Sequence, residues 1–252
     1  MRLTLIGHAT VLVELDGVRL LTDPLLRGRV TFLRAQPELP APAELAGLDA
    51  VLLSHFHRDH FDPASLRRLD RATLVVGPPG TAERVGKLGF DRAAELSPGE
   101  SVAVGDVSVR ATKALHGRLP ARFRSVALGF VVAGSERLYF AGDTDLFPEL
   151  AELAAERIDV ALLPVGGWGP RLGAGHLDPL RAAQAARLVR PRVAIPIHWG
   201  SLRPIGLGPL RPRYLTEPGE AFARLTAGIV PGVEVRVVRP GETVELAGSG
   251  GA

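Results

Sequence analysis

Short apolar runs, each closed by a turn signal, recur along both halves of this 252-residue chain. The runs that read as strands cover residues 3–15, 18–22, 50–54, 73–77, 101–104, 107–114, 125–133, 137–141, 160–164 and 194–197. Segments of helical character lie between or after them, following Asp62-Pro63, over 80–88, after Asp145, over 178–190 and near 217–227. The alternation predicts two β-sheets packed face to face with helices outside.

Turn signals refine this pattern. Asp16-Gly17 predicts a hairpin, and Pro240-Gly241 predicts a second one near the end of the chain. Residues 27–48 carry several prolines and are expected to form a loop. Since no repeat or change of composition divides the sequence, we expect one domain over residues 1–252.

Composition excludes several classes of protein. Without cysteine, the chain has no disulfide scaffold, thiolate zinc finger, iron-sulfur cluster or cysteine nucleophile. The sequence pI near 9.9 suggests nucleic acid, but the net charge is only +3, and all cations except Lys87 and Lys113 are arginine. Because this bias is typical of GC-rich coding sequence, we expect no stable nucleic-acid partner.

The compartment is predicted from the absence of targeting patterns. The first residues alternate like a strand and do not resemble a secretory signal. No apolar run approaches the roughly 20 residues of a membrane helix. We therefore expect a cytoplasmic protein without integral membrane association, and the sequence leaves open whether it forms a homo-oligomer.

Histidine placement carries the chemistry. Almost every histidine stands at the end of an apolar run or in the turn after it; the seven are His8, His55, His57, His60, His116, His176 and His198. Residues two apart in extended backbone point to the same side, so His55 and His57 can bind one metal ion. Asp59 and His60 follow where the chain turns and face a second position.

Two ions need more ligands than this motif supplies. Three later apolar runs each end in a suitable side chain: His116, Asp143 and His198. A carboxylate can bridge two cations, whereas a neutral imidazole cannot. The expected allocation is His55, His57 and His116 on one ion, Asp59, His60 and His198 on the other, and Asp143 between them. Imidazole and carboxylate ligands without thiolate suit two divalent ions, Zn²⁺ first, with Mn²⁺ or Fe²⁺ as alternatives.

These motifs resemble the metallo-β-lactamase fold superfamily. The blocks GHATVLVEL, LTDP, DAVLLSHFHRDHFD, FAGDTD, LPVGGW-GPR, HLDP and IHWG are most similar to bacterial relatives of N-acyl phosphatidylethanolamine-hydrolysing phospholipase D, and more distantly to ascorbate-6-phosphate lactonases. The resemblance implies an α/β (α+β) fold, a four-layer αβ/βα sandwich of two mixed sheets with a dinuclear site on its rim. His57, where flavodiiron oxidoreductases have Glu, argues against redox iron.

The expected activity is hydrolysis. Two cations about 3.5 to 4 Å apart would share a water and lower its pKa toward neutrality, giving a bridging hydroxide that attacks an electrophile. A small anionic phosphodiester is the expected substrate. The alternatives are a lactone or other ester of a phosphorylated sugar, nucleic-acid processing, and a metal-bound scaffold without catalysis. Asp59, Asp143 and His176 are the expected catalytic residues.

His176 and Arg171 are the candidate substrate-binding residues. The resemblance implies that His176 contacts a substrate phosphate or donates a proton to the leaving group; alternatively, it merely precedes the helix start at Asp178-Pro179. Arg171 would hold an anion, or is an ordinary surface residue.

Other residues near the expected site have less defined roles. His8 is either structural or supports a ligand, and Asp23 is expected to support the ligand loop by hydrogen bonding. Trp168 and Trp199 either line an apolar pocket or pack in the core. Loop arginines near the ligands would give a cationic mouth or reflect composition alone; they are Arg118, Arg122, Arg124, Arg203, Arg211 and Arg213.

Overall fold

The computed structural model describes residues 1–35, 45–117, 126–207, 210 and 212–246. One seven-stranded sheet has the order β17-β1-β2-β3-β6-β7-β8. Its strands are β1 (Arg2–Gly7), β2 (Thr10–Leu15), β3 (Val18–Thr22), β6 (Ala50–Leu52), β7 (Leu74–Gly77), β8 (Ala93–Glu95) and β17 (Thr243–Glu245).

The second seven-stranded sheet has the order β16-β14-β13-β12-β11-β10-β9. Its strands are β9 (Ser101–Val104), β10 (Val107–Lys113), β11 (Leu128–Ala133), β12 (Arg137–Phe140), β13 (Val160–Pro164), β14 (Val193–Ile197) and β16 (Glu234–Val235). Both sheets are mixed, because β3, β6, β7 and β8 are parallel neighbours, as are β12, β13, β14 and β16, while the remaining pairs are antiparallel.

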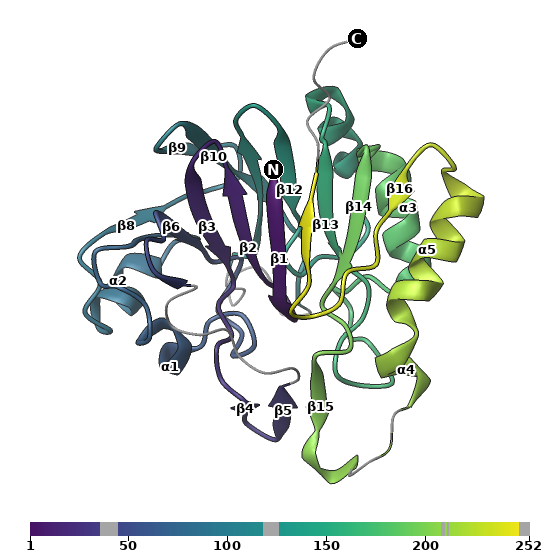
Figure 1. The fold of residues 1–252 in the computed structure, drawn as a ribbon, viewed down its shortest axis with the longest axis horizontal. Coiled ribbons are helices and arrows are strands. Elements are labelled where there is room, and N and C mark those ends of the chain that lie inside the picture. The colour runs from purple at the N-terminus through teal and green to yellow at the C-terminus, as the bar shows by residue number, and fades with distance from the viewer. Residues whose placement is uncertain (36–44, 118–125, 208–209, 211, 247–252) are drawn as a thin grey trace.

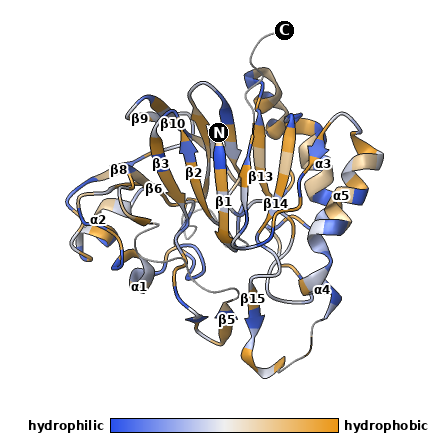
Figure 2. Cartoon of the chain, viewed as in Figure 1, coloured by the Kyte–Doolittle hydropathy of each residue, from blue (hydrophilic) through white to orange (hydrophobic). Residues whose placement is uncertain are grey.

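Helices cover the outer faces of the two sheets, and the sheets enclose an apolar core (Figures 1 and 2). The helices are α1 (Pro63–Leu66), α2 (Thr81–Gly86), the 3₁₀ helix η3 (Pro148–Glu156), α3 (Pro179–Val189), the 3₁₀ helix η4 (Ile205–Leu207), α4 (Arg213–Thr216) and α5 (Pro218–Ile229). Leu66 and Val85 pack on the first sheet, while Leu150, Ala186 and Phe222 pack on the second. The predicted four-layer αβ/βα sandwich is confirmed.

Local signals explain several elements. Asp16 and Gly17 have φ values of 52° and 79°, the left-handed pair that a tight hairpin between β2 and β3 requires. Asp62 begins α1 by accepting a hydrogen bond from the backbone N–H of Ser65. Asp178 begins α3 in the same way through Arg181.

Four sequence predictions need correction. The run 3–15 is two strands, because Gly7 and His8 turn the chain back with φ of 154° and 56°. Residues 27–48 include two short strands, β4 (Arg29–Val30) and β5 (Leu33–Ala35). The segment after Asp145 forms a 3₁₀ helix rather than an α-helix.

The fourth correction concerns the predicted hairpin around Pro240-Gly241. The strand before this turn, β16, pairs with β14 in the second sheet, while the strand after it, β17, pairs with β1 in the first. The turn therefore connects the two sheets. The prolines of the expected 27–48 loop and the GSGGA end lie outside the described residues.

The topology brings the predicted site residues to one edge. β1 and β3 run parallel to β6 within the first sheet, and β10 and β14 run parallel to β12 within the second. Within each sheet, the carboxyl ends of these three strands therefore point in the same direction. A third, three-stranded sheet of β4, β5 and β15 (Leu202–Pro204) lies beyond these ends (Figure 1).

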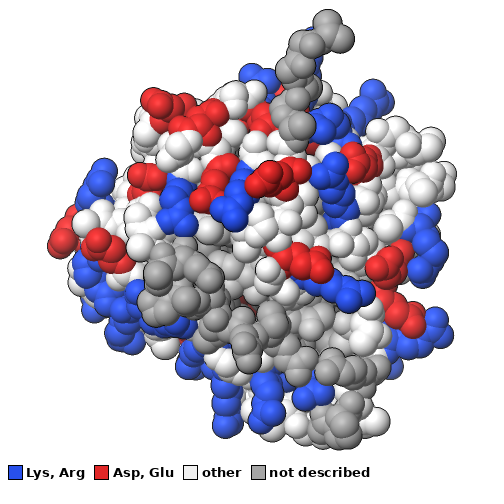
Figure 3. All heavy atoms as spheres, viewed as in Figure 1, with Lys and Arg blue, Asp and Glu red and all other residues white. Residues whose placement is uncertain are grey.

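Among the described residues, no helix is both long and apolar enough to cross a bilayer. Figure 3 shows cationic and anionic side chains interspersed over the upper part of the visible face, with several cations along the lower edge.

Candidate metal centre

The structure gathers all seven histidines, together with Asp23, Asp59 and Asp143, into overlapping groups whose ligand atoms lie within 4.8 Å of one another. The groups are His55/His57/His116, His8/Asp59/His60/His198, Asp23/His55/His60 and His116/Asp143/His176. The first two contain the two ligand triads predicted from the sequence. His8 is an additional member of the second.

The three-histidine group forms where β6 and β10 end. His57 Nδ1 lies 3.0 Å from His116 Nε2, and the rings of His55 and His57 are 4.5 Å apart between centroids. His55 Nε2 is buried and has no hydrogen-bond partner among the described residues. A buried polar atom without a partner is costly, so this nitrogen is placed for a ligand that the protein itself does not supply.

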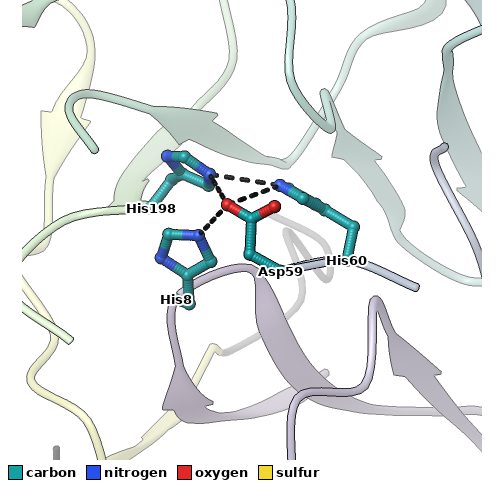
Figure 4. A group of neighbouring side chains, drawn as sticks. All are labelled: His8, Asp59, His60 and His198. Carbon is teal, nitrogen blue, oxygen red and sulfur yellow. Dashed lines mark hydrogen bonds and ion pairs between the residues drawn. The ribbon is translucent and has the colours of Figure 1, made fainter. Parts of the chain in front are cut away.

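The second group lies beside the first and is drawn in Figure 4. His60 Nε2 and His198 Nε2 are 3.1 Å apart. Asp59 Oδ2 points between them, 4.0 Å from each nitrogen, and lies 3.3 Å from His8 Nε2. Three imidazole nitrogens and one carboxylate oxygen thus converge from β1, β14 and the turn after β6.

Asp143 connects the two groups. Its Oδ1 lies 3.2 Å from His198 Nε2, and its Oδ2 lies 3.4 Å from His60 Nε2 and 4.0 Å from His116 Nε2. The residue is 2% exposed. One buried carboxylate therefore reaches nitrogens of both groups, which is the position that the sequence predicted for a bridging residue.

Hydrogen bonds fix the opposite nitrogen of several rings. His60 Nδ1 donates to Asp23 Oδ2 at 2.7 Å, and the same carboxylate accepts from the backbone N–H and hydroxyl of Ser54. His116 Nδ1 lies 2.8 Å from the carbonyl of Gly175, and His198 Nδ1 lies 2.9 Å from that of Gly166. These contacts leave Nε2 of each ring facing the centre. The hydrogen bonding predicted for Asp23 is present, to His60 and to Ser54 next to His55.

Several residues around the histidine groups have left-handed backbone conformations. His8 and His198 both adopt left-handed φ values, 56° and 64°, and the His198 N–H donates to the His8 carbonyl at 2.9 Å. At Gly175, with φ of 88°, a Cβ would lie 2.5 Å from the Gly117 nitrogen and 2.9 Å from the His116 Cα. Sequence reasoning gave no role to Gly175, because only the close approach of the two loops shows why it is glycine.

The pKa values of the buried histidines are shifted in opposite directions. Burial, with neighbouring His60, lowers the pKa of His55 well below its ordinary value, and burial lowers that of His198 to about 3 despite the opposing charge of Asp143. Burial alone would also lower the pKa of His60, but Asp143, Asp23 and Asp59 outweigh it and raise that pKa well above the ordinary value.

Asp143 shows the converse balance. Burial alone would raise its pKa, but His198 and His60, with hydrogen bonds from His176 and His60, hold that pKa well below the ordinary range. The ionised Asp143 carboxylate and the neutral rings of His55 and His198 are donors suited to divalent cations, since metal ligands must be deprotonated. His60 has to lose its extra proton before its Nε2 can bind an ion. The unpartnered His55 nitrogen and the absence of thiolate fit the imidazole and carboxylate preferences of zinc, manganese and iron(II).

A pocket of about 420 Å³ opens over this centre. His57, Asp59, Asp143, His176 and His198 face it, and so does Arg171. His176 Nε2 lies 3.3 Å from Asp143 Oδ2, and Asp143 with that hydrogen bond raises the pKa of His176 against the lowering effect of burial.

Of the predicted tryptophans and loop arginines, some line this pocket and others do not. Trp168 lines the pocket, whereas Trp199 does not; its indole N–H donates to the Pro196 carbonyl. Arg203 lies on β15 and Arg213 pairs with Glu217, and neither lines this pocket. Arg118, Arg122, Arg124 and Arg211 lie outside the described residues. Phe32 and Arg58 line the pocket and were not predicted. Nothing in the sequence places the 27–48 segment, which carries Phe32, over the site. Arg58 stands between the predicted ligands His57 and Asp59, and that position could have indicated it.

Comparison with known proteins places the chain in a family. The model of the "Beta-lactamase superfamily domain" matches residues 18–199. A "UPF0173 metal-dependent hydrolase" from Opitutus terrae is 36% identical, over 98% of this chain and 100% of that protein. One of the same name from Methanopyrus kandleri is 33% identical over 97% and 100%.

Solved structures share the fold. An isothiocyanate hydrolase from Delia radicum gut bacteria superposes with a TM-score of 0.77 at 22% identity, covering 98% of this chain and 100% of that chain. CmlA, a diiron β-hydroxylase from Streptomyces venezuelae, gives 0.77 at 20% identity, covering 97% and 54%. With the family match extending from β3 to the turn after β14, this chain belongs to the metallo-β-lactamase superfamily and is one of its metal-dependent hydrolases.

Proposed function

We propose that this hydrolase cleaves a small anionic ester, a phosphodiester first, at a centre of two divalent cations, with zinc as the first choice of metal. The observation that carries the proposal is the position of Asp143, whose two carboxylate oxygens face nitrogens of both histidine groups. One ion would be held by His55, His57 and His116, and the other by Asp59, His60 and His198. When bound, such ions supply Lewis-acid chemistry and an activated water.

Asp59 and His176 supply the two remaining catalytic roles in this proposal, orienting the attacking water and donating a proton. Asp59 is partly exposed to the pocket and held by His8, so it can orient the attacking water by accepting its hydrogen bond. His176 lies at the pocket wall, and the proximity of Asp143 favours its protonated form. That form can donate a proton to the departing oxygen of the substrate, as a general acid does.

Cationic side chains support the choice of an anionic substrate. Arg58 and Arg171 both line the pocket, and no carboxylate among the described residues forms an ion pair with either. An unpaired guanidinium binds phosphate oxygens in two-point fashion. The resemblance of the sequence blocks to the phospholipase D-like group supports a phosphodiester substrate. The more distant resemblance to the lactonase-like group makes a lactone or other ester of a phosphorylated sugar the alternative substrate.

The test combines metal analysis with a substrate screen. Zinc-loaded wild type is expected to hydrolyse bis-p-nitrophenyl phosphate faster than a phosphomonoester or a lactone. Asp143→Ala should lose both metal and turnover, whereas His176→Ala should keep metal and lose turnover. Lactone turnover above diester turnover would reassign the substrate, and metal loss without loss of activity in Asp143→Ala would contradict the proposed mechanism.

Arg171 has a matched control. Arg171→Ala should raise KM for the diester with a small effect on kcat, because its contact is made in the bound substrate as well as in the transition state. Arg187, an exposed arginine on α3 away from the pocket, serves as the control, and Arg187→Ala should leave KM unchanged.

A further inference from the structure

Two exposed aromatic side chains stand at the mouth of the metal-centre pocket. Phe32 is 52% exposed and Trp168 is 39% exposed. They come from distant parts of the chain, the turn between β4 and β5 and the loop after β13. Their rings meet edge to face, with centroids 5.1 Å apart. Because the two rings are in contact, they form a continuous exposed apolar surface, a feature that often marks a ligand-binding site.

The turn that carries Phe32 is strained. β4 and β5 pair through Val30 and Leu33, so Thr31 and Phe32 are the two turn residues. Thr31 has a φ of 51°, a left-handed conformation that is unfavourable for a β-branched residue. The turn is nevertheless held in place, because the Phe32 carbonyl accepts a hydrogen bond from the Ile205 N–H at 3.0 Å. Strain that persists in an exposed turn points to a function for the residue it presents.

The lining of the pocket combines apolar and charged side chains. Val30, Leu33 and Leu172 line it together with the aromatic pair. Arg58 and Arg171 supply positive charge, and the carboxylates and imidazoles of the metal centre form the floor. All belong to one pocket of about 420 Å³, a volume that accommodates a ring-sized group together with an anionic head.

We propose that Phe32 and Trp168 bind an apolar, ring-sized group of the substrate while its anionic ester group lies on the metal-centre floor. This inference rests on the proposed function for the position of the ester, and it adds the substrate class: an anionic ester that carries an aryl or similarly flat apolar group. The two rings are specificity-determining residues, since they touch the part of the substrate that does not react.

The test measures binding without turnover. Phenylphosphonate and methylphosphonate carry the same anionic head and differ in the ring, and each is titrated calorimetrically into zinc-loaded protein. Wild type should bind phenylphosphonate about tenfold more tightly, the range of one aromatic contact. In Phe32→Ala and Trp168→Ala this ratio should fall toward one, whereas Phe32→Tyr, which keeps a ring, should preserve it.

Leu180→Ala is the control, because Leu180 is 46% exposed on α3 and does not line the pocket. It should leave the ratio unchanged. Equal binding of the two phosphonates by wild type, absence of binding of both, or a ratio that survives in both alanine variants would each overturn the inference.

Turnover of bis-p-nitrophenyl phosphate in the same preparations separates the two proposals. A ring preference in binding without diester turnover would leave the aromatic site standing and remove the proposed reaction. Diester turnover without a ring preference would do the reverse.

Discussion

His60 donates through Nδ1 to the carboxylate of Asp23 over 2.7 Å, and its Nε2 faces His198 and Asp143 on the other side of the ring. Both His60 and Asp23 are fully buried. The contact fixes which nitrogen faces the centre and orients the ring, a role that outer carboxylates commonly have for metal-bound imidazoles. Asp23 also accepts hydrogen bonds from Ser54, whose hydroxyl lies 3.0 Å from His55 Nδ1, so one carboxylate contacts one candidate ligand directly and a second through Ser54.

Asp23→Asn should weaken zinc affinity by roughly 10- to 100-fold, because the amide cannot replace the charge that orients and polarises His60. Competition with a chromophoric chelator measures this. Asp62→Asn is the matched control: Asp62 is as buried as Asp23, but it caps α1 and its charge pairs with Arg27, not with a histidine of the centre. It should lower the melting temperature and leave zinc affinity unchanged. Equal zinc affinity in wild type and Asp23→Asn would refute the assigned role.

Gly175→Ala should destabilise the fold by roughly 1–3 kcal/mol and weaken metal binding, because its Cβ collides with the His116 backbone and its φ is left-handed. Gly86→Ala is the comparison, since Gly86 ends α2 with open space around it. That change should be neutral or slightly stabilising. Chemical denaturation of the metal-free proteins gives both values, and a Gly175→Ala variant as stable as wild type would show that the loops do not approach this closely.

Metal binding should release protons and weaken as the pH falls. His55 and His198 have lowered pKa values, about 3 for His198, so they are neutral near pH 7 and have no proton to lose. His60 has a raised pKa and carries a proton that a cation must displace. Calorimetry in buffers of different ionisation enthalpy should therefore give release of at least one proton per chain near pH 7, the one from His60, with any further release coming from the activated water. Affinity that rises toward acid pH would contradict this assignment.

Thr31→Gly should raise the stability of the protein by up to about 1 kcal/mol, because glycine adopts the left-handed turn without strain. Thr4→Gly, on the extended strand β1, should lower stability instead. Thermal unfolding of the two variants distinguishes local strain from a general effect of glycine. A Thr31→Gly variant less stable than wild type would show that the turn is not strained.

Much of the sandwich could be predicted because its strands are short apolar runs with clear turn signals, as at Asp16-Gly17. The errors lie where tertiary context decides. β16 and β17 flank a good turn sequence, yet each pairs with a different sheet. β4 and β5 have two and three residues, too few for any periodicity to show.

The clustering of the candidate metal ligands could be predicted because these side chains follow directly after buried strands. His8 and Asp23 also end strands, but spacing alone could not show that one contacts Asp59 and the other His60. Gly175 and Phe32 were beyond prediction, since their roles depend on loops that approach from elsewhere in the chain.

The most direct test of the two-ion centre is the number of zinc ions bound per chain, measured by mass spectrometry after equilibrium dialysis of wild type and Asp143→Asn. We expect two ions per wild-type chain and a loss of at least one in the variant, because Asp143 reaches both histidine groups. One ion or none in wild type, or two ions retained in Asp143→Asn, would contradict the two-ion centre.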